Sequence, residues 1–101
     1  MTVDAPHIFM DISRLLSRAR NPIPTGIDRV EYEYVHYLLH HEAARLTFVA
    51  FHPLGSIGSL PRGAVRNFLH VMGDVWRGNI APRSHLVRLA LLLTQSILLS
   101  Q

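Results

Sequence analysis

The feature that most constrains the fold is an amphipathic helical segment between two short runs of strand-forming residues. Residues 7–12 and 46–51 are apolar runs of strand length, and a His-Pro pair closes the second run. Between them, over residues 26–41, apolar side chains recur at helical spacing: Ile27, Val30, Tyr34 and Leu38, widened by Val35 and Leu39. A strand, a helix and a strand in this order predict a βαβ unit whose two strands are parallel.

Two other segments show no clear hydrophobic periodicity. Residues 13–20 are polar and basic, and the prolines that follow forbid a continuous helix, so this segment is predicted to connect the first strand to the helix. Residues 54–61 contain two glycines and end in a proline, which predicts a loop.

Two further helices are predicted in the second half of the chain. Apolar residues at helical spacing over residues 62–76 include Phe68 and Trp76, which we assign to the core. Ser84 is a suitable N-cap for a last helix over residues 84–100, in which apolar residues cover nearly every face. Such a helix needs neighbours on several sides.

Composition excludes several classes of protein. With 101 residues, of which 49% are hydrophobic and 17% charged, the chain is long enough for one packed domain and too apolar for a disordered one. The absence of cysteine agrees with a reducing cytoplasm, and no secretory signal precedes the first strand. The net charge of +3 is spread along the chain without a basic stripe, so we expect no nucleic-acid partner.

The end of the sequence indicates an incomplete domain. Two strands do not form a stable sheet alone, and an all-round apolar helix has too little here to cover it. The run of residues 86–99 also falls short of the ~20 apolar residues that a membrane span needs. We therefore expect residues 1–101 to be an N-terminal fragment whose missing partners lie C-terminal.

The loop before the central helix is the main candidate site. Thr25 is a good N-cap, Asp28 stands where a capping carboxylate belongs, and Gly26 leaves the backbone uncovered. The amides of Gly26 and Ile27 then point out of the positive end of the helix dipole, which favours anions such as phosphate. The alternative is an ordinary helix cap.

Four more residues are candidates for positioning a substrate. Asp11 lies near the end of the first strand and His52 follows the second, at the edge where open α/β sheets bind ligands, although a turn-stabilising Asp and a solvated loop His are the alternatives. Arg29 either faces this cleft, pairs with Glu33 or contacts Asp28. Arg14 belongs to a small basic group that suits a phosphate-bearing acceptor or an anionic membrane surface, with Arg18 and Arg20.

Three histidines raise the question of a metal. His36 and His40 share one helix face at i,i+4 spacing, and His41 follows them. Because no third ligand is evident on that face, we expect no metal site.

Two segments together resemble a known family. Residues 11–16, Asp-Ile-Ser-Arg-Leu-Leu, followed by residues 24–30, Pro-Thr-Gly-Ile-Asp-Arg-Val, resemble the N-terminus of bacterial glycosyltransferases of family 4, the retaining GT-B group. These enzymes open with a strand ending in Asp-(Ile or Val)-(Ser or Thr)-Arg-Leu, then a loop and a Gly-Ile-(Asp or Glu)-Arg-Val helix start. The resemblance covers residues 7 to about 52, and beyond Pro53 it is one of pattern.

This resemblance implies an α/β fold: a Rossmann-like parallel βαβ unit, the incomplete N-terminal half of a GT-B fold. Its enzyme would transfer a sugar from a nucleotide-sugar donor to a saccharide or lipid-linked acceptor, without a metal or another cofactor. By similarity, residues Thr25, Gly26, Ile27 and Asp28 approach the donor diphosphate, and Arg29 positions substrate.

The resemblance also implies what this chain lacks. In the family the C-terminal domain holds the nucleotide and the paired acidic residues that act on it, so we expect the fragment to be inactive alone and assign no catalytic residue. The alternative is a small non-catalytic α/β binding module, or one that lies peripherally on the inner membrane through residues 86–99, in which residues 24–28 only cap a helix.

Overall fold

The computed structural model describes residues 6–20, 24–78 and 83–99. Its elements follow the chain in this order: strand β1 (Ile8–Asp11), helix α1 (Ser13–Ser17), 3-10 turn η1 (Arg18–Arg20), helix α2 (Gly26–His41), 3-10 turn η2 (Ala43–Arg45), strands β2 (Leu46–Phe51) and β3 (Ile57–Leu60), and helices α3 (Arg62–Trp76) and α4 (Arg83–Leu99). The chain is thus a small mixed α/β domain.

The sheet has the order β1-β2-β3. β1 pairs with β2 in parallel, from Ile8 opposite Leu46 to Asp11 opposite Val49, which confirms the predicted parallel pair. β3 pairs with β2 in the antiparallel direction, with Phe51 opposite Ile57. The sheet is therefore mixed.

The strand β3 corrects the prediction of a loop over residues 54–61. A tight turn reverses the chain after β2: the His52 N–H donates to the Ser56 carbonyl at 2.7 Å and the Gly55 N–H to the His52 carbonyl at 2.8 Å. Gly55 has φ +98°, a conformation that L side chains rarely adopt. This glycine therefore closes a hairpin.

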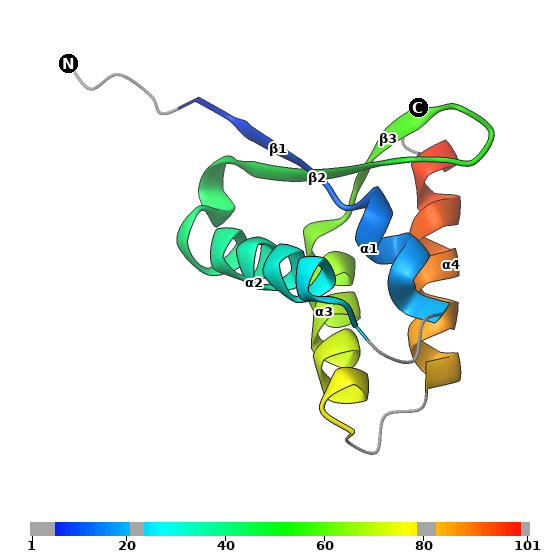
Figure 1. Ribbon diagram of the computed structural model, residues 1–101. Helices are drawn as coiled ribbons and strands as arrows, with labels where there is room; N and C mark the ends of the chain where they lie inside the picture. The colour runs from blue at the N-terminus through cyan, green and yellow to red at the C-terminus, as the bar shows by residue number, and fades with distance from the viewer. Residues whose placement is uncertain (1–5, 21–23, 79–82, 100–101) are drawn as a thin grey trace.

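All four helices lie on one side of the sheet, below the strands in the view of Figure 1. The side chains of β2 alternate accordingly: Leu46, Phe48 and Ala50 are buried under the helices, whereas Phe51 is exposed. Phe9 of β1 and Ile57 of β3 are likewise exposed. We call the side with Phe9, Phe51 and Ile57 the bare face of the sheet, because no helix of the described ranges covers it.

Helix α2 has the predicted bounds, but the predicted core face was right only in part. Ile27 and Val30 are 68% and 71% exposed, and Tyr34 is also exposed. Val35, Leu38 and Leu39 of the predicted face are buried, and Asp28, which was placed outside that face, is buried with them. The reason is electrostatic, because two arginines of the preceding segment hold Asp28 inside the molecule and so fix the rotation of the helix.

Residues 13–20 are helical, which corrects the prediction of an irregular connection. Leu15, Leu16 and Ala19 are buried in the core, while Arg14 and Arg18 pair with Asp28. The spacing of these three apolar residues is that of one helix face, which the high polarity of the segment concealed. Pro22 lies outside the described residues.

The two last helices agree with prediction in extent. Helix α3 has the predicted bounds, and Gly78, with φ +75°, follows it; the rest of the predicted break, residues 79–82, lies outside the described residues. Helix α4 begins at Arg83, so Ser84 lies inside it and is not its N-cap as predicted.

The apolar residues of α4 divide between core and surface. Leu86, Ala90, Leu93 and Ile97 are buried at helical spacing, whereas Leu91, Leu92 and Leu98 are exposed. Within residues 6–20, 24–78 and 83–99, no helix combines the length and apolar character needed to cross a bilayer.

Candidate functional site

The start of helix α2 has the predicted capping geometry. The Asp28 N–H donates to Thr25 Oγ1 at 3.2 Å, and the Thr25 N–H donates to Asp28 Oδ2 at 2.9 Å, which completes a capping box. Each side chain thus accepts a hydrogen bond from the backbone N–H of the other residue. The amides of Gly26 and Ile27 remain, and neither has a hydrogen-bond acceptor among the described residues.

Open space lies above these amides. Gly26 and Ile27 are exposed, and a Cβ placed on Gly26 would meet no atom of a described residue within 4 Å. A helix start with uncovered amides is a favourable place for an anion, because the N–H groups and the helix dipole act in the same direction. This glycine leaves room for a ligand to approach the backbone.

The Asp28 carboxylate is buried between two arginines and does not face this space. Its oxygens lie 2.6 Å from Arg14 Nη1 and 3.0 Å from Arg18 Nε, and its side chain is 1% exposed. Burial opposes ionisation, but the Thr25 N–H and the guanidinium groups of Arg18 and Arg14 together lower the pKa of Asp28 below its usual range. The carboxylate therefore stays ionised and holds Arg14 and Arg18 beside the helix start.

The pKa of Glu31, one turn further along α2, is shifted in the opposite direction from that of Asp28. Burial raises its pKa, although Arg14, 3.8 Å away, lowers it in part. When Glu31 is ionised, the charges of Asp28 and Glu31 cancel those of Arg14 and Arg18. The attraction for an anion at this helix start therefore comes mainly from the amides and from Arg14, whose side chain is 39% exposed.

Asp11 closes a turn at the carboxyl end of β1. Asp11 Oδ1 accepts hydrogen bonds from the Ser13 N–H at 2.8 Å and the Ser13 hydroxyl at 2.5 Å. The same hydroxyl accepts from the Phe51 N–H at 2.8 Å. Ser13 thus links the ends of the two parallel strands, and the observed contacts of Asp11 are those of a turn-stabilising residue.

A hollow of about 310 Å³ lies beside these strand ends. It runs between α1, the end of β2 and α4, and it is lined by Ser13, Leu16, Ser17, Ala19, Phe51, Pro53, Val87, Ala90, Leu91 and Thr94. Its hydroxyls are already engaged, since Ser17 donates to the Arg14 carbonyl and Thr94 to the Ala90 carbonyl. The hollow is therefore mainly an apolar space at the carboxyl edge of the sheet.

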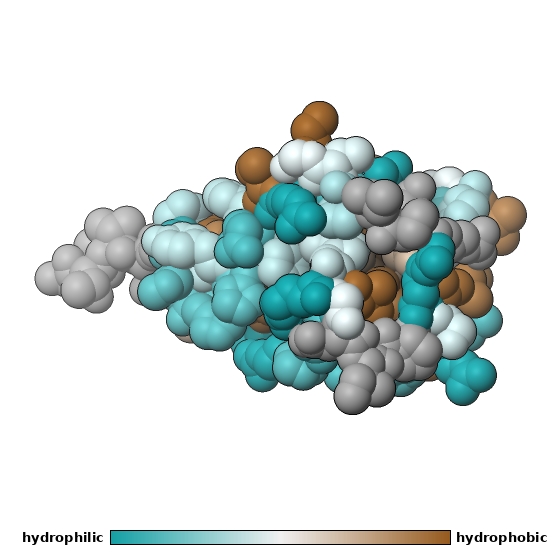
Figure 2. Space-filling view, turned by 60° about the horizontal axis from the view of Figure 1, so that its bottom comes forward, coloured by the Kyte–Doolittle hydropathy of each residue, from teal (hydrophilic) through white to brown (hydrophobic). Residues whose placement is uncertain are grey.

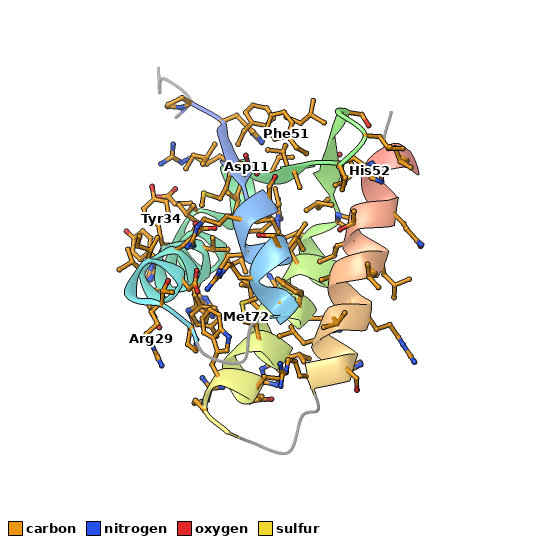
Figure 3. The ribbon with its side chains drawn as sticks, turned by 45° about the vertical axis from the view of Figure 1, so that its right-hand side comes forward. Asp11, Arg29, Tyr34, Phe51, His52 and Met72 are labelled. Carbon is orange, nitrogen blue, oxygen red and sulfur yellow. The ribbon has the colours of Figure 1, made fainter. Side chains whose placement is uncertain are left out.

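The other two predicted positioning residues lie elsewhere. His52 Nδ1 accepts from the Leu54 N–H at 3.1 Å, so this side chain belongs to the β2–β3 hairpin. Arg29 lies on the opposite side of the molecule from His52, as Figure 3 shows, and lines a hollow between α2 and α3. Arg29 has no ion pair with Glu33 or with another described residue. The structure thus brings Arg14 to residues 25–28. The Arg29 side chain lies in the hollow between α2 and α3, and His52 lies in the hairpin.

The histidines of α2 stack and do not form a metal site within the described ranges. The rings of His36 and His40 lie 4.2 Å apart, and His40 Nδ1 is 2.9 Å from the His36 carbonyl oxygen. No three side chains of the His, Cys, Asp or Glu type come together there as a group of metal ligands.

The sequence interpretation missed the partners of Asp28. It treated Arg14 and Arg18 as a surface group, yet both reach into the capping box; their i,i+4 spacing after a strand is the signal that places them on one helix face.

Comparison with known proteins adds no relative. No protein-family description, curated protein or solved structure matches the chain.

Proposed function

We propose that this chain is the phosphate-facing N-terminal part of a sugar-nucleotide transferase of the retaining GT-B type, with a Rossmann-like fold. The observation that carries the proposal is the start of α2. There the Gly26 and Ile27 amides face open space, with Arg14 held beside them by Asp28. The resemblance of residues 11–16 and 24–30 to family 4 glycosyltransferases supplies the reaction.

The proposed contacts follow from the chemistry of these groups. Oxygens of the donor diphosphate accept hydrogen bonds from the two amides, and the helix dipole and the exposed part of Arg14 add attraction for negative charge. The apolar hollow at the strand ends accommodates part of the acceptor. The base and ribose of the donor are expected to be held by a second domain, whereas the diphosphate contacts this chain, so transfer is expected only when a C-terminal donor-binding half is supplied.

A nucleotide titration of the 101-residue chain tests the proposal. We expect UDP, GDP or ADP to shift the amide resonances of Gly26 and Ile27, and the Gly26→Val variant to bind at least tenfold more weakly. Gly63→Val is the matched control, because Gly63 is also exposed in the first turn of a helix with no described atom near its Cβ position. Equal binding by wild type and Gly26→Val would reject the proposed site.

A second candidate function is a non-catalytic module that lies on a membrane surface. Its supporting observation is helix α4, which exposes Leu91, Leu92 and Leu98 in addition to its buried stripe. Co-sedimentation with phosphatidylglycerol vesicles tests it: wild type is expected to bind and Leu91→Ser/Leu92→Ser to lose binding. If the wild type stays in the supernatant, this candidate is rejected.

A further inference from the structure

Helices α2 and α3 enclose a groove that the proposed function does not use. Two hollows of about 300 and 310 Å³ lie along the seam between these helices and share Tyr32 and Arg77. The first is completed by Arg29, Glu33, Gly73 and Trp76. The second is completed by His36, Leu39, His40, Arg66, Leu69 and His70. We call the two hollows together the α2–α3 groove.

Four rings form a continuous row along this groove. Trp76 lies 5.4 Å from Tyr32, Tyr32 lies 6.0 Å from His36, and His36 lies 4.2 Å from His40, measured between ring centroids. Adjacent rings at these distances pack against one another and limit each other's rotation. The row gives the groove a fixed wall.

Positive charge exceeds negative charge in the groove. Arg29 and Arg66 have no ion-pair partner among the described residues, so their guanidinium groups are available to a ligand. Arg77 pairs with Asp74 at 3.0 Å, and His70 lies 3.5 Å from the same carboxylate. The groove therefore has three arginines, Arg29, Arg66 and Arg77, against two carboxylates, Glu33 in its lining and Asp74 beside it. Figure 2 shows this helix side of the molecule largely covered by hydrophilic residues.

An unsatisfied donor lies at one end of the groove. Trp76 Nε1 is buried and has no hydrogen-bond acceptor in the described part of the chain. Buried N–H groups are rarely left without a partner, so an acceptor oxygen is expected near this donor.

We propose that the α2–α3 groove binds an anion that carries several phosphates in line. Arginine guanidinium groups match phosphate geometry with paired hydrogen bonds. The groove extends from Arg29 past Arg77 to Arg66, and the eleven residue steps from position 66 to 77 span about 16 Å at the rise of an α-helix. A single phosphate contacts one end of such a groove, whereas a chain of phosphates contacts two or three arginines together.

Intrinsic fluorescence tests this proposal directly, because Trp76 is the one tryptophan of the chain. At constant ionic strength we expect saturable quenching by inorganic tripolyphosphate, with at least tenfold tighter binding than inorganic phosphate. ATP in a parallel titration separates two sources of the ligand. Equal affinity for ATP and tripolyphosphate indicates an inorganic polyphosphate, and tighter binding of ATP indicates a nucleotide.

Charge-neutralising variants identify the site. Arg29→Gln and Arg66→Gln are each expected to weaken tripolyphosphate binding about tenfold, the effect of losing one charge-assisted contact. Arg88→Gln on α4 removes the same charge outside the groove and is expected to change affinity less than twofold. An equal loss in all three variants would show non-specific attraction and overturn the proposal.

A further variant separates this groove from the start of α2. Gly26→Val is expected to leave the quenching of Trp76 by tripolyphosphate unchanged, because this signal reports the groove and not the start of α2. Binding that disappears in Gly26→Val but persists in Arg29→Gln and Arg66→Gln would assign the anion to the helix start, and it would overturn the groove proposal while leaving the proposed function intact. The two proposals therefore fail separately.

Discussion

The two sides of the sheet carry similar side chains in opposite surroundings. Phe48 and Phe51 belong to the same strand, yet Phe48 is 1% exposed beneath the helices and Phe51 is 56% exposed on the bare face. Figure 3 shows the contrast, with Phe51 above the strands and Met72 of α3 among the helices below them. An apolar strand sequence therefore indicates a strand without indicating how many layers cover it.

The largest expected difference between the two sides is in this pair of phenylalanines. Phe48→Ala is expected to lower the free energy of unfolding by about 3–5 kcal/mol, because it removes buried contacts and leaves a cavity. Urea denaturation monitored by circular dichroism measures the change.

Phe51→Ala is the matched control on the bare face. It is expected to lower the free energy of unfolding by about 1 kcal/mol or less, as is usual for exposed positions. If the two variants were equally destabilised, the bare face would have to be covered in solution.

The covered side also buries a charge, and removing that charge is the next largest effect. Asp28→Asn leaves Arg14 and Arg18 without their shared carboxylate, so we expect a loss of about 3 kcal/mol at pH 7. Because the pKa of Asp28 is lowered from its ordinary value of 3.8, its stabilisation is present above that pH and is lost as the pH falls through the folded-state pKa.

Urea denaturation at several pH values separates this charge from other effects. The gap between wild type and Asp28→Asn is expected to be constant from pH 7 to about 5 and to narrow below about pH 4. Glu31 is present in both proteins, so the difference between the curves reports Asp28. A gap that does not change with pH would contradict the ion-pair assignment.

A smaller effect sharpens the same contrast on helix α2. Val35→Ala, on the buried face, is expected to lower the free energy of unfolding by about 2 kcal/mol through loss of two buried methyl groups. Val30→Ala, on the exposed face, is expected to stay within about 0.5 kcal/mol of wild type, because alanine also favours helix. Thermal unfolding of both variants measures the difference; a larger loss in Val30→Ala than in Val35→Ala would contradict the observed rotation of α2.

The smallest expected effect concerns the helix caps. Thr25→Ala removes the acceptor for the Asp28 N–H and is expected to lower the free energy of unfolding by about 1 kcal/mol. Ser84→Ala is the control, since Ser84 lies within α4 and its replacement is expected to change stability by less than about 0.5 kcal/mol. A larger effect at Ser84 than at Thr25 would reject these helix starts.

The sequence predicted those elements whose signals are local. Strand-forming runs placed β1 and β2, and apolar residues at helical spacing placed α2 and α3. Thr25 and Asp28 were predicted as the capping residues of α2. The rotation of α2 was not predictable in this way. It depends on Asp28 pairing with arginines from a different helix, and a hydrophobic pattern contains no information about that pairing.

In the candidate site, too, local features were predictable and features that depend on packing were not. The exposed amides of Gly26 and Ile27 follow from local capping rules, whereas the positions of Arg29 and His52 depend on how α2 and the hairpin are turned. The arginines of the α2–α3 groove were not grouped by the sequence analysis, because they come from two helices and share no sequence motif. Such a site is visible only when the helices are packed.

The different pairings of β2 have a consequence for how the chain folds. The β2–β3 hairpin closes across residues 52–56, while the parallel pairing of β1 with β2 must close across residues 12–45. Since the entropy lost in closing a loop grows with its length, we expect the hairpin to form first and β1 to join afterwards. The last strand to join is then the first to detach during local opening. Amide hydrogen exchange in native conditions should therefore be faster in β1 than in β2.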